Sequence, residues 1–409
     1  MPRPWSPGHA VAVALILVTG GTIALLSRVG PVAAVLRAAT QQPAVAGHLV
    51  TPPPTGLAGT PTERLVPTAS DASGSGSTRV PAGTQAATGS AAGVPAEAVG
   101  AMPRGLWRDR ERVGVGVPEP PIDRYPVSEL GFGWYHAWRV IEAPPPVDGL
   151  QVWQMVRVSE NGYRPDATAI SRAVRGTPGA TWLIGNEPDV IWQDNTTPET
   201  YARAYHDVYH LLKSLDPSCR VAVGGIAQPS PVRLEYLERV RAAYALAYGE
   251  RMPVEMWHIH NFILREERGS WGVDIPPGIE TDRGRLYDVQ DNDNLTAFKS
   301  QIVEFRRWMA AHAERDRPLV VSEYGIPMPI DYGFGAERVG VFLTATFDFL
   351  LMASDPEIGL PADGNRLVQH WAWFSMGDTL YPTGNLVDLE TGQLTQLGHV
   401  FAGYVGRLH

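Results

Sequence analysis

Two glutamates, each at the end of a short apolar run, are the residues whose types and spacing best predict chemistry. Glu187 lies in "TWLIGNEP" (181–188) and Glu323 in "PLVVSEYG" (318–325). Two carboxyl groups at one site are what hydrolysis of a glycosidic bond needs, because one protonates the leaving oxygen while the other attacks or activates water. Either glutamate alone is better explained as a buried salt-bridge partner. The pair, together with its polar and aromatic neighbours, favours catalysis.

Aromatic and imidazole side chains occur at the ends of the other apolar runs, where they are candidates for contacts with a sugar. The candidates are His258, His260, Tyr324, Trp371, Trp373 and Trp134. Side chains alternate along a strand, so the two histidines of "WHIHN" share one face and the two tryptophans of "WAW" share another. A tryptophan can stack on the apolar face of a sugar ring, and Tyr324 can hydrogen-bond the adjacent Glu323. Core packing is the competing explanation for each aromatic residue.

Short strands and amphipathic helices alternate along the chain and must position these residues. The expected strands are 130–138, 150–158, 181–188, 220–226, 255–264, 318–325 and 367–375. The helix after "TWLIGNEP" has Thr197 as a cap and Pro198 in its first turn. Repeated alternation of this kind predicts an α/β fold, a (β/α)8 TIM barrel, in which both glutamates end strands at the same mouth. A doubly wound sheet is disfavoured because no glycine-rich phosphate loop follows the first strand.

The order of these motifs resembles clan A of the glycoside hydrolases, which are retaining enzymes on a TIM barrel. The resemblance covers about residues 125–409 and rests on "NEP", "WHIHN", "VVSEYG" and the tryptophans of the last strand. It implies that Glu187 is the acid/base, Glu323 the nucleophile and Asn186 the residue that holds the sugar 2-hydroxyl. It also implies a role for His258 or His260, and for Trp371 or Trp373 as a stacking platform. Family 39, family 5 and the Asl1-like β-glucanases are equally similar.

The chain departs from this pattern upstream of Glu187, where three strands are expected and only 130–138 and 150–158 are clear. The N-terminal half of the barrel is therefore expected to be abbreviated or irregular, with "RVIEAPPPVDG" (139–149) as one place for the abbreviation. Arg157 would match the arginine on the clan's second strand if it lies on that strand.

The N-terminal quarter differs in composition from the rest of the 409 residues. The run "VAVALILVTGGTIALL" (11–26) carries no charge and follows Arg3 and His9, which predicts an uncleaved membrane anchor or a signal segment over residues 1–40. Residues 41–105 are dominated by Ala, Gly, Pro, Ser and Thr and are expected to form a disordered tether. The barrel is expected over residues 106–409, outside the cytoplasm, either secreted or held at the outer face of the membrane.

The overall composition narrows the choice of partner. A net charge of -9 disfavours nucleic acid and anionic lipid, since both require clustered Lys and Arg. A poly- or oligosaccharide substrate fits better, and the expected contact with a membrane is limited to the N-terminal segment. Cys219 is the single cysteine, so no intramolecular disulfide forms. The glycosidase chemistry requires no metal and no organic cofactor.

Two other functions remain open at the level of the sequence. "HIH" suggests a metal-dependent barrel hydrolase, although that fold places such a pair on its first strand. A non-catalytic carbohydrate-binding surface protein would keep the barrel and its aromatic residues. The long segment 264–294 is expected to cover part of the mouth. Its acidic residues, Asp288, Asp291 and Asp293, lack the remaining ligands of a calcium loop and are expected to be turn residues.

Overall fold

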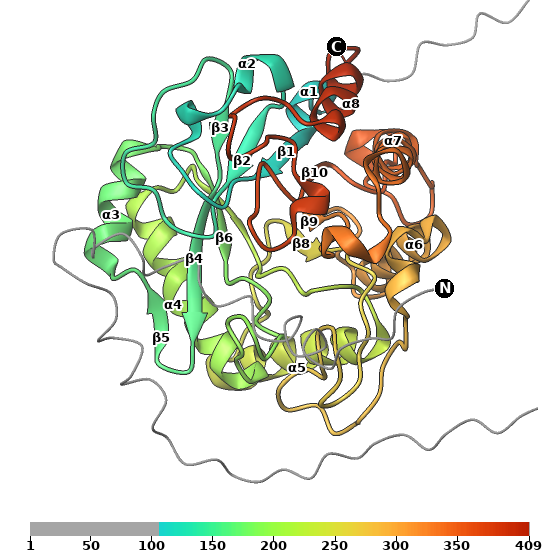
Figure 1. Cartoon of the computed structure of the whole chain (residues 1–409). Coiled ribbons are helices and arrows are strands. Elements are labelled where there is room, and N and C mark those ends of the chain that lie inside the picture. The colour runs from blue at the N-terminus through green and yellow to red at the C-terminus, as the bar shows by residue number, and fades with distance from the viewer. Residues whose placement is uncertain (1–105, 409) are drawn as a thin grey trace, which may run out of the picture. The chain divides into compact units, whose positions relative to one another are not determined.

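The computed structural model describes residues 106–408. The expected anchor (1–40) and tether (41–105) lie outside this range. No helix within residues 106–408 is both long enough and apolar enough to span a membrane. The described chain is drawn from cyan to red in Figure 1.

Parallel strands form a closed barrel in which each strand neighbours the next one along the chain. The ring consists of β1 (Val113–Gly116), β2 (Trp134–His136), β3 (Gln151–Val152) continued by β4 (Gln154–Ser159), β6 (Thr181–Ile184), β7 (Arg220–Ala222), β8 (Trp257–His260), β9 (Leu319–Tyr324) and β10 (His370–Trp373). It closes because β1 pairs in parallel with β10. Bridges from Ala222 to Met256 and from Ile226 to Ile259 join β7 to β8. The expected (β/α)8 barrel is confirmed.

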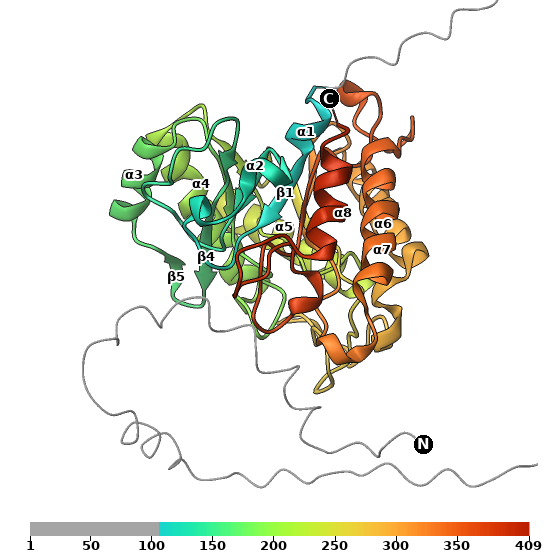
Figure 2. The ribbon, with the colours of Figure 1, turned by 45° about the horizontal axis from the view of Figure 1, so that its top comes forward.

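Helices cover the outside of the barrel, and most of them lie in its C-terminal two thirds. The longer helices are α3 (Ala167–Gly176), α4 (Pro198–Leu215), α5 (Pro231–Tyr248), α6 (Leu295–Ala311), α7 (Ala336–Met352) and α8 (Gln396–Val405). As expected, Thr197 caps α4 by accepting a hydrogen bond from the backbone N–H of Thr200, and Pro198 occupies its first turn. Figure 2 shows α6, α7 and α8 side by side along one flank.

The N-terminal half of the barrel is abbreviated, as the sequence predicts. The single-turn helix α1 (Asp109–Arg112) precedes β1, and the connection from β1 to β2 has only the 3-10 turn η2 (Ile122–Arg124) and the single-turn helix α2 (Val127–Leu130). Residues 139–149, between β2 and β3, include no helix. The chain then makes a hairpin from β4 to β5 (Gly162–Arg164) before α3.

The first barrel strand, β1, is absent from the strands expected from the sequence, and the run 130–138 therefore contains the second strand. The sequence of β1 is "VGVG", and glycine is depleted in strands, which makes the signal weak. Gly114 is nevertheless required by packing, because a Cβ there would lie 2.4 Å from the Trp134 ring. Arg157 lies on β4, the third barrel strand, so the condition for its match to a second-strand arginine is not met.

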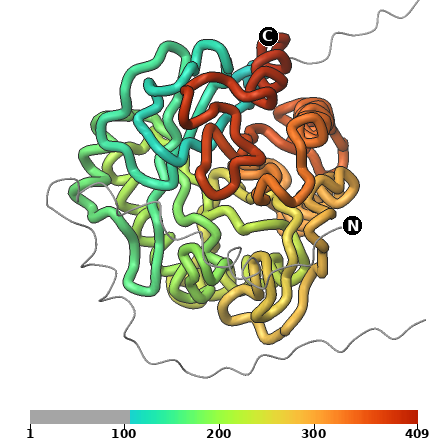
Figure 3. The backbone as a smooth tube through the Cα atoms, in the orientation of Figure 1, coloured from blue at the N-terminus to red at the C-terminus, as the bar shows by residue number. Residues whose placement is uncertain are grey.

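Two hydrophobic layers hold the barrel. Inside it, a small cluster is made by Trp134, Trp153, Met155, Leu183, Ala222, Met256, Val320 and Ala372. A much larger cluster fills the space between the strands and the helices. Both faces of the barrel strands are therefore buried, one in the lumen and one under the helices. Figure 3 shows the long loop after β8, in yellow and gold, at the lower edge of the described chain.

Candidate active site

Glu187 and Glu323 lie at the same end of the barrel, beyond the carboxyl ends of β6 and at the end of β9. Their exposed fractions are 3% and 5%, so both carboxyl groups are largely removed from water. They line one small pocket together with Gln193, Phe262, Leu264, Gly272, Val273, Pro327, Met328, Phe374 and Tyr381. The carboxyl ends of the strands are where barrel enzymes place their reacting groups.

His260, on β8, lies between the two glutamates and contacts both. Its Nδ1 is 2.9 Å from Oε1 of Glu187, and its Nε2 is 3.0 Å from Oε1 of Glu323. The imidazole is completely buried. One ring therefore spans the distance between the two carboxyl groups, and each glutamate is positioned through the same side chain.

The pKa values of the two glutamates in this cluster are shifted in opposite directions. Burial raises the pKa of Glu187, and the neighbouring charge of Glu323 adds to the rise, while His260 opposes it. Burial also acts to raise the pKa of Glu323, but His260, His136 and the Trp138 N–H outweigh it and hold that pKa below its usual value. Burial alone would lower the pKa of His260, yet the two carboxylates raise it to about 10. The arrangement therefore favours an ionised Glu323 beside a protonated His260, and it shifts the pKa of Glu187 in the direction that favours its protonated form.

The turn that presents Glu187 depends on a network around Asp194. One oxygen of Asp194 accepts hydrogen bonds from the backbone N–H of Asn186 at 2.7 Å and of Val158 at 3.0 Å. Its other oxygen accepts from Arg157 Nε at 2.6 Å. Asn186 Nδ2 donates to Gln193 Oε1 at 3.3 Å. Arg157 and Asp194 thus position the backbone beside the acid, and neither contacts a carboxyl group of the pair.

Backbone conformation explains why the apolar strand ends in "GNEPD". Gly185 has φ of 95°, which glycine adopts without steric cost. Glu187 has φ of 44°, an uncommon value for a side chain of this size and typical of residues held in place at functional sites. The second acid, Asp189, forms a buried ion pair with Arg233 of α5. Arg233 Nε also donates to Glu266 at 2.7 Å, so the segment after Glu187 is tied to α5 and to the loop after β8.

Trp138, and not the predicted Trp134, contacts the carboxyl pair. Its Nε1 donates to Glu323 Oε1 at 2.6 Å, and its backbone φ is 50°. The adjacent His136 donates through Nε2 to the Ser322 carbonyl at 3.0 Å. The aromatic cluster at 134–138 could have indicated Trp138 from the sequence. A residue just beyond the end of a barrel strand lies nearer the mouth than the first residue of that strand.

Four of the expected sugar contacts lie away from the carboxyl pair. Trp134 is inside the barrel at the start of β2, stacked on Trp153 at 3.9 Å. Tyr324, Trp371 and Trp373 belong to the cluster between the strands and the helices. Trp373 Nε1 donates to the Gly384 carbonyl at 2.8 Å, and Trp371 packs edge-on against Phe347 of α7. The shared face of the two tryptophans is therefore the outer one, and the small Ala372 faces the lumen.

His258 faces the barrel interior, like His260, but it contacts neither glutamate. Its Nδ1 is 2.8 Å from the Val223 carbonyl, and its Nε2 is 2.5 Å from the Ser322 hydroxyl. Burial and the positive charge of His260 lower its pKa well below the usual value. Of the two histidines, only His260 is positioned to affect the carboxyl pair directly.

Within the described range, no group of three or more His, Cys, Asp or Glu side chains has the arrangement of a metal site. The acidic residues of the loop after β8 have structural roles in the part of the chain that is described. Asp293 pairs with Arg338, with its Oδ1 2.6 Å from Arg338 Nη2. The Asp291 carboxylate accepts a hydrogen bond from the Asp288 N–H at 2.8 Å.

If the carboxyl pair catalyses hydrolysis, replacing Trp138 by Phe is expected to shift the acidic limb of the pH–rate profile of that reaction to higher pH. The indole N–H lowers the pKa of Glu323, so its removal raises that pKa, and more acid-side activity is lost as pH falls. Loss of a hydrogen bond to a charged group predicts a decrease in kcat/KM of about tenfold. Trp308→Phe is the matched control, because Trp308 Nε1 donates to Glu238, away from this site. An unchanged acidic limb in Trp138→Phe would contradict the role given to Trp138.

Replacing Trp371 by Ala is expected to destabilise the fold without altering substrate affinity. Its side chain is fully buried in the outer core, and truncating such a residue lowers the free energy of unfolding by about 3–5 kcal/mol. Leu246→Ala serves as the control because Leu246 is 90% exposed. Denaturant unfolding and KM are measured on both. A large rise in KM with an unchanged free energy of unfolding would instead show that Trp371 contacts the substrate.

Comparison with known proteins gives structural likenesses only. No protein-family model matches the chain, and no curated protein does. Similar solved structures include an endo-β-1,3-glucanase of glycoside hydrolase family 128 from Sorangium cellulosum, which is 17% identical with a TM-score of 0.49 over 71% of this chain and 97% of that chain. The family 128 enzyme from Amycolatopsis mediterranei, in complex with laminaritriose, is 18% identical with a TM-score of 0.48 over 72% and 99%. At these scores, the likeness transfers no activity to this chain.

Proposed function

We propose that this chain is a glycoside hydrolase that cleaves a β-linked poly- or oligosaccharide with retention of configuration. The observation that carries the proposal is the buried Glu187–His260–Glu323 cluster at the C-terminal mouth of the barrel. Two titratable groups whose surroundings move their pKa values in opposite directions are suited to the acid and nucleophile roles. The pKa of Glu187 is raised and that of Glu323 is lowered.

In the first step, Glu323 Oε1 or Oε2 attacks the anomeric carbon, and Glu187 gives its proton to the leaving glycosidic oxygen. A covalent glycosyl-enzyme forms, the sugar C–O bond breaks, and Glu187 is left ionised. In the second step, Glu187 takes a proton from water, whose oxygen attacks the anomeric carbon and releases Glu323 as a carboxylate. Two inversions at one carbon give net retention. Trp138 and protonated His260 stabilise ionised Glu323 before attack and after release.

The mouth is nearly closed in this structure. The pocket beside the carboxyl pair has a volume of ≈ 50 Å³, whereas ligand pockets in proteins typically have about 300–1,000 Å³. Its walls include Leu264, Gly272 and Val273 from the loop after β8, and Phe374 and Tyr381 from the segment after β10. Substrate entry therefore requires these two segments to separate, as lids do in other enzymes.

The test is an assay of reducing-sugar release from β-1,3-glucan, cellulose, xylan and mannan, combined with proton NMR of the first product formed. Retention predicts that the new reducing end appears first as the β-anomer and then mutarotates. First appearance of the α-anomer would rule out the retaining mechanism while leaving hydrolysis in place. A protein that binds one of these glycans without turnover would instead be a carbohydrate-binding protein. Activity abolished by a chelator and restored by a metal would favour the metal-dependent alternative.

We also propose that the barrel acts outside the cytoplasm, either secreted or held at the membrane by the N-terminal segment. The support is the sequence alone: an uncharged run at 11–26 and a linker rich in small residues at 41–105. Cell fractionation with protease treatment of intact cells tests it. A barrel that remains protected from protease in intact cells and is found in the cytosolic fraction would contradict the proposal.

A further inference from the structure

The strand that carries Glu323, β9, contains one residue more than its neighbours over the same stretch. Ile259 of β8 pairs with Val321 of β9. The next residue of β8, His260, pairs with Glu323, so Ser322 has no partner on that strand. The pairing of β9 with β10 shifts by one residue over the same stretch. An extra residue of this kind is a β-bulge, which bends a strand and turns the side chain that follows.

The bulge interrupts the alternation of side chains along β9. Val320 belongs to the cluster inside the barrel and Val321 to the cluster under the helices, as alternation requires. Ser322 faces the barrel interior again, where a histidine of β8 contacts its hydroxyl. Continued alternation would place Glu323 under the helices and Tyr324 in the mouth. Instead Glu323 contacts His260 in the mouth, and Tyr324 packs under the helices.

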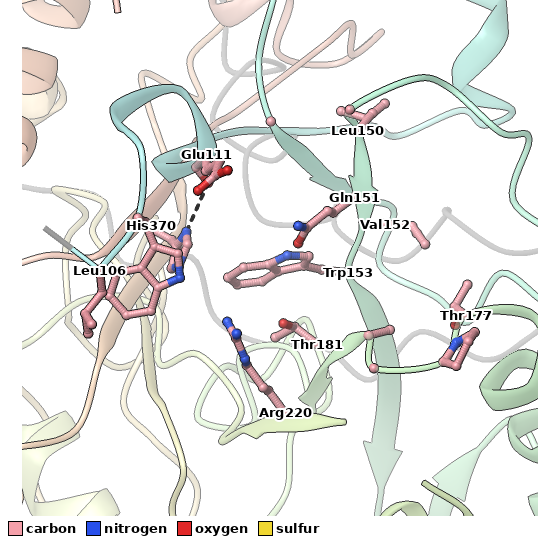
Figure 4. Close-up of a pocket in the computed structure, with 16 residues that line it drawn as sticks. Leu106, Glu111, Leu150, Gln151, Val152, Trp153, Thr177, Thr181, Arg220 and His370 are labelled. Carbon is pink, nitrogen blue, oxygen red and sulfur yellow. Dashed lines mark hydrogen bonds between the residues drawn. The ribbon is translucent and has the colours of Figure 1, made fainter. Parts of the chain in front are cut away.

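The inward side chains of three strands lie in successive layers along the barrel. On β2 and β8 these residues are two positions apart, whereas on β9 the last two are adjacent because of the bulge. In order toward the mouth they are Trp134, His136 and Trp138 on β2, Met256, His258 and His260 on β8, and Val320, Ser322 and Glu323 on β9. Figure 4 shows the strand-start end of the barrel, where Trp153 and His370 are among the residues that line an open pocket. The middle layer therefore separates apolar residues from the carboxyl pair.

Buried histidines of this middle layer hold the hydroxyl and the carbonyl of Ser322. His136 Nε2 donates to the Ser322 carbonyl at 3.0 Å. His258 Nδ1 lies 2.8 Å from the Val223 carbonyl, which can only accept, so Nδ1 carries the proton. His258 Nε2 is then bare and accepts from the Ser322 hydroxyl at 2.5 Å. All three side chains are completely buried, so these contacts compensate for the ladder bonds that a bulge disrupts.

The two histidines are neutral, as these contacts require. Burial lowers the pKa of His136. Burial and the positive charge of His260 lower the pKa of His258 well below its usual value. A protonated His258 would donate through both ring nitrogens and could not accept from Ser322. The positive charge next to the carboxyl pair therefore stays on His260, while the layer beneath it is uncharged.

We propose that the bulge at Ser322, held by His258 and His136, aims Glu323 into the mouth. The three residues are positioning residues for the nucleophile, because they act through the backbone next to Glu323 and contact neither carboxyl group. The inference rests on the proposed function, which assigns the nucleophile role to Glu323. It adds that the aim of this carboxylate depends on a polar layer one step deeper in the barrel.

The first test replaces Ser322 by Ala in the full chain, which removes the hydroxyl and keeps the backbone. We expect kcat on the most active glycan to fall about tenfold with KM unchanged, because Glu323 is less well aimed while the groups that bind the substrate stay in place. The indole N–H of Trp138 donates to Glu323 and reports its position. Its NMR signal, identified by its absence in Trp138→Phe, should move in Ser322→Ala.

A double-mutant cycle separates positioning from a general loss of stability. His258→Leu removes the acceptor of the Ser322 hydroxyl, so its effect on kcat should not add to that of Ser322→Ala in the double variant. His258→Gln offers an amide oxygen in place of Nε2 and should recover part of the lost activity. Thr177→Val is the matched control, because it removes a hydroxyl that donates to the Ala173 carbonyl at the end of α3. It should leave kcat and the Trp138 signal unchanged.

The outcomes distinguish this inference from the proposed function. If the wild type is active, an unchanged kcat in Ser322→Ala, a loss carried by KM alone or an unmoved Trp138 signal would overturn the positioning role and leave the hydrolase intact. Additive losses in the double variant would also overturn it. If the wild type hydrolyses none of the glycans and the Trp138 signal still moves, the proposed function fails and the bulge still places the carboxylate. An inert chain with an unmoved signal contradicts both.

Discussion

Replacing Glu323 by Gln is expected to reduce kcat/KM for glycan hydrolysis by about 10⁴-fold or more, the size of loss seen when a member of a covalent catalytic unit is removed. Gln has the same shape and can still accept a hydrogen bond from Trp138, which lies 2.6 Å from Glu323 Oε1. It offers no ionised oxygen to attack the anomeric carbon. The variant should therefore fold and bind substrate but fail to form the glycosyl-enzyme.

The measurement is kcat/KM on the most active glycan, together with thermal unfolding of the same preparation. Glu235→Gln is the matched control, because Glu235 is a half-exposed carboxylate on α5, paired with Arg239. It removes one negative charge without touching the site. Activity close to wild type in Glu323→Gln would exclude Glu323 as nucleophile. A comparable loss in Glu235→Gln would show that the assay reports charge or stability.

Replacing Glu187 by Gln is expected to lower kcat/KM by roughly 10²–10⁴-fold on natural glycans, the usual contribution of a general acid. The loss should be much smaller on an aryl glycoside with a strongly acidic phenol, because that leaving group departs without protonation. Comparing the two substrates separates loss of proton donation from general damage to the site. Equal losses on both would contradict the acid role of Glu187.

The pH dependence gives an independent check on the same two roles. Glu323 must be ionised, so activity falls as pH drops through its lowered pKa. Glu187 must be protonated, so activity falls as pH rises through its raised pKa. The alkaline limb should disappear in Glu187→Gln while the acidic limb remains. A profile of Glu187→Gln that keeps the wild-type alkaline limb would assign that limb to another group, of which protonated His260 is the nearest.

The strand order and the placement of the two glutamates were predictable from the sequence because they depend on local patterns. Apolar runs of strand length alternate with helical periods, and "NEP" and "SEY" follow such runs directly. The carboxyl ends of parallel barrel strands meet at one mouth, so Glu187 and Glu323 belong together as soon as the barrel is assigned. The first strand, "VGVG", was not predicted, because Gly114 makes room for Trp134 and Gly116 for Trp138, and these tertiary contacts leave no local pattern in the sequence.

Side-chain alternation along a strand was enough to predict which residues share a face. The pairs His258 with His260 and Trp371 with Trp373 were predicted correctly on that basis. Which face points into the barrel, and how far along the barrel each residue lies, follow from the packing of strands and helices and were not predictable. The tertiary structure placed His260, and not His258, between the carboxyl groups, and it turned both tryptophans outward. The physical reason is that both faces of a barrel strand are buried, one in the lumen and one under the helices. On β10 the two tryptophans and Ala372 are all apolar and all buried, so hydrophobicity cannot tell the two faces of that strand apart.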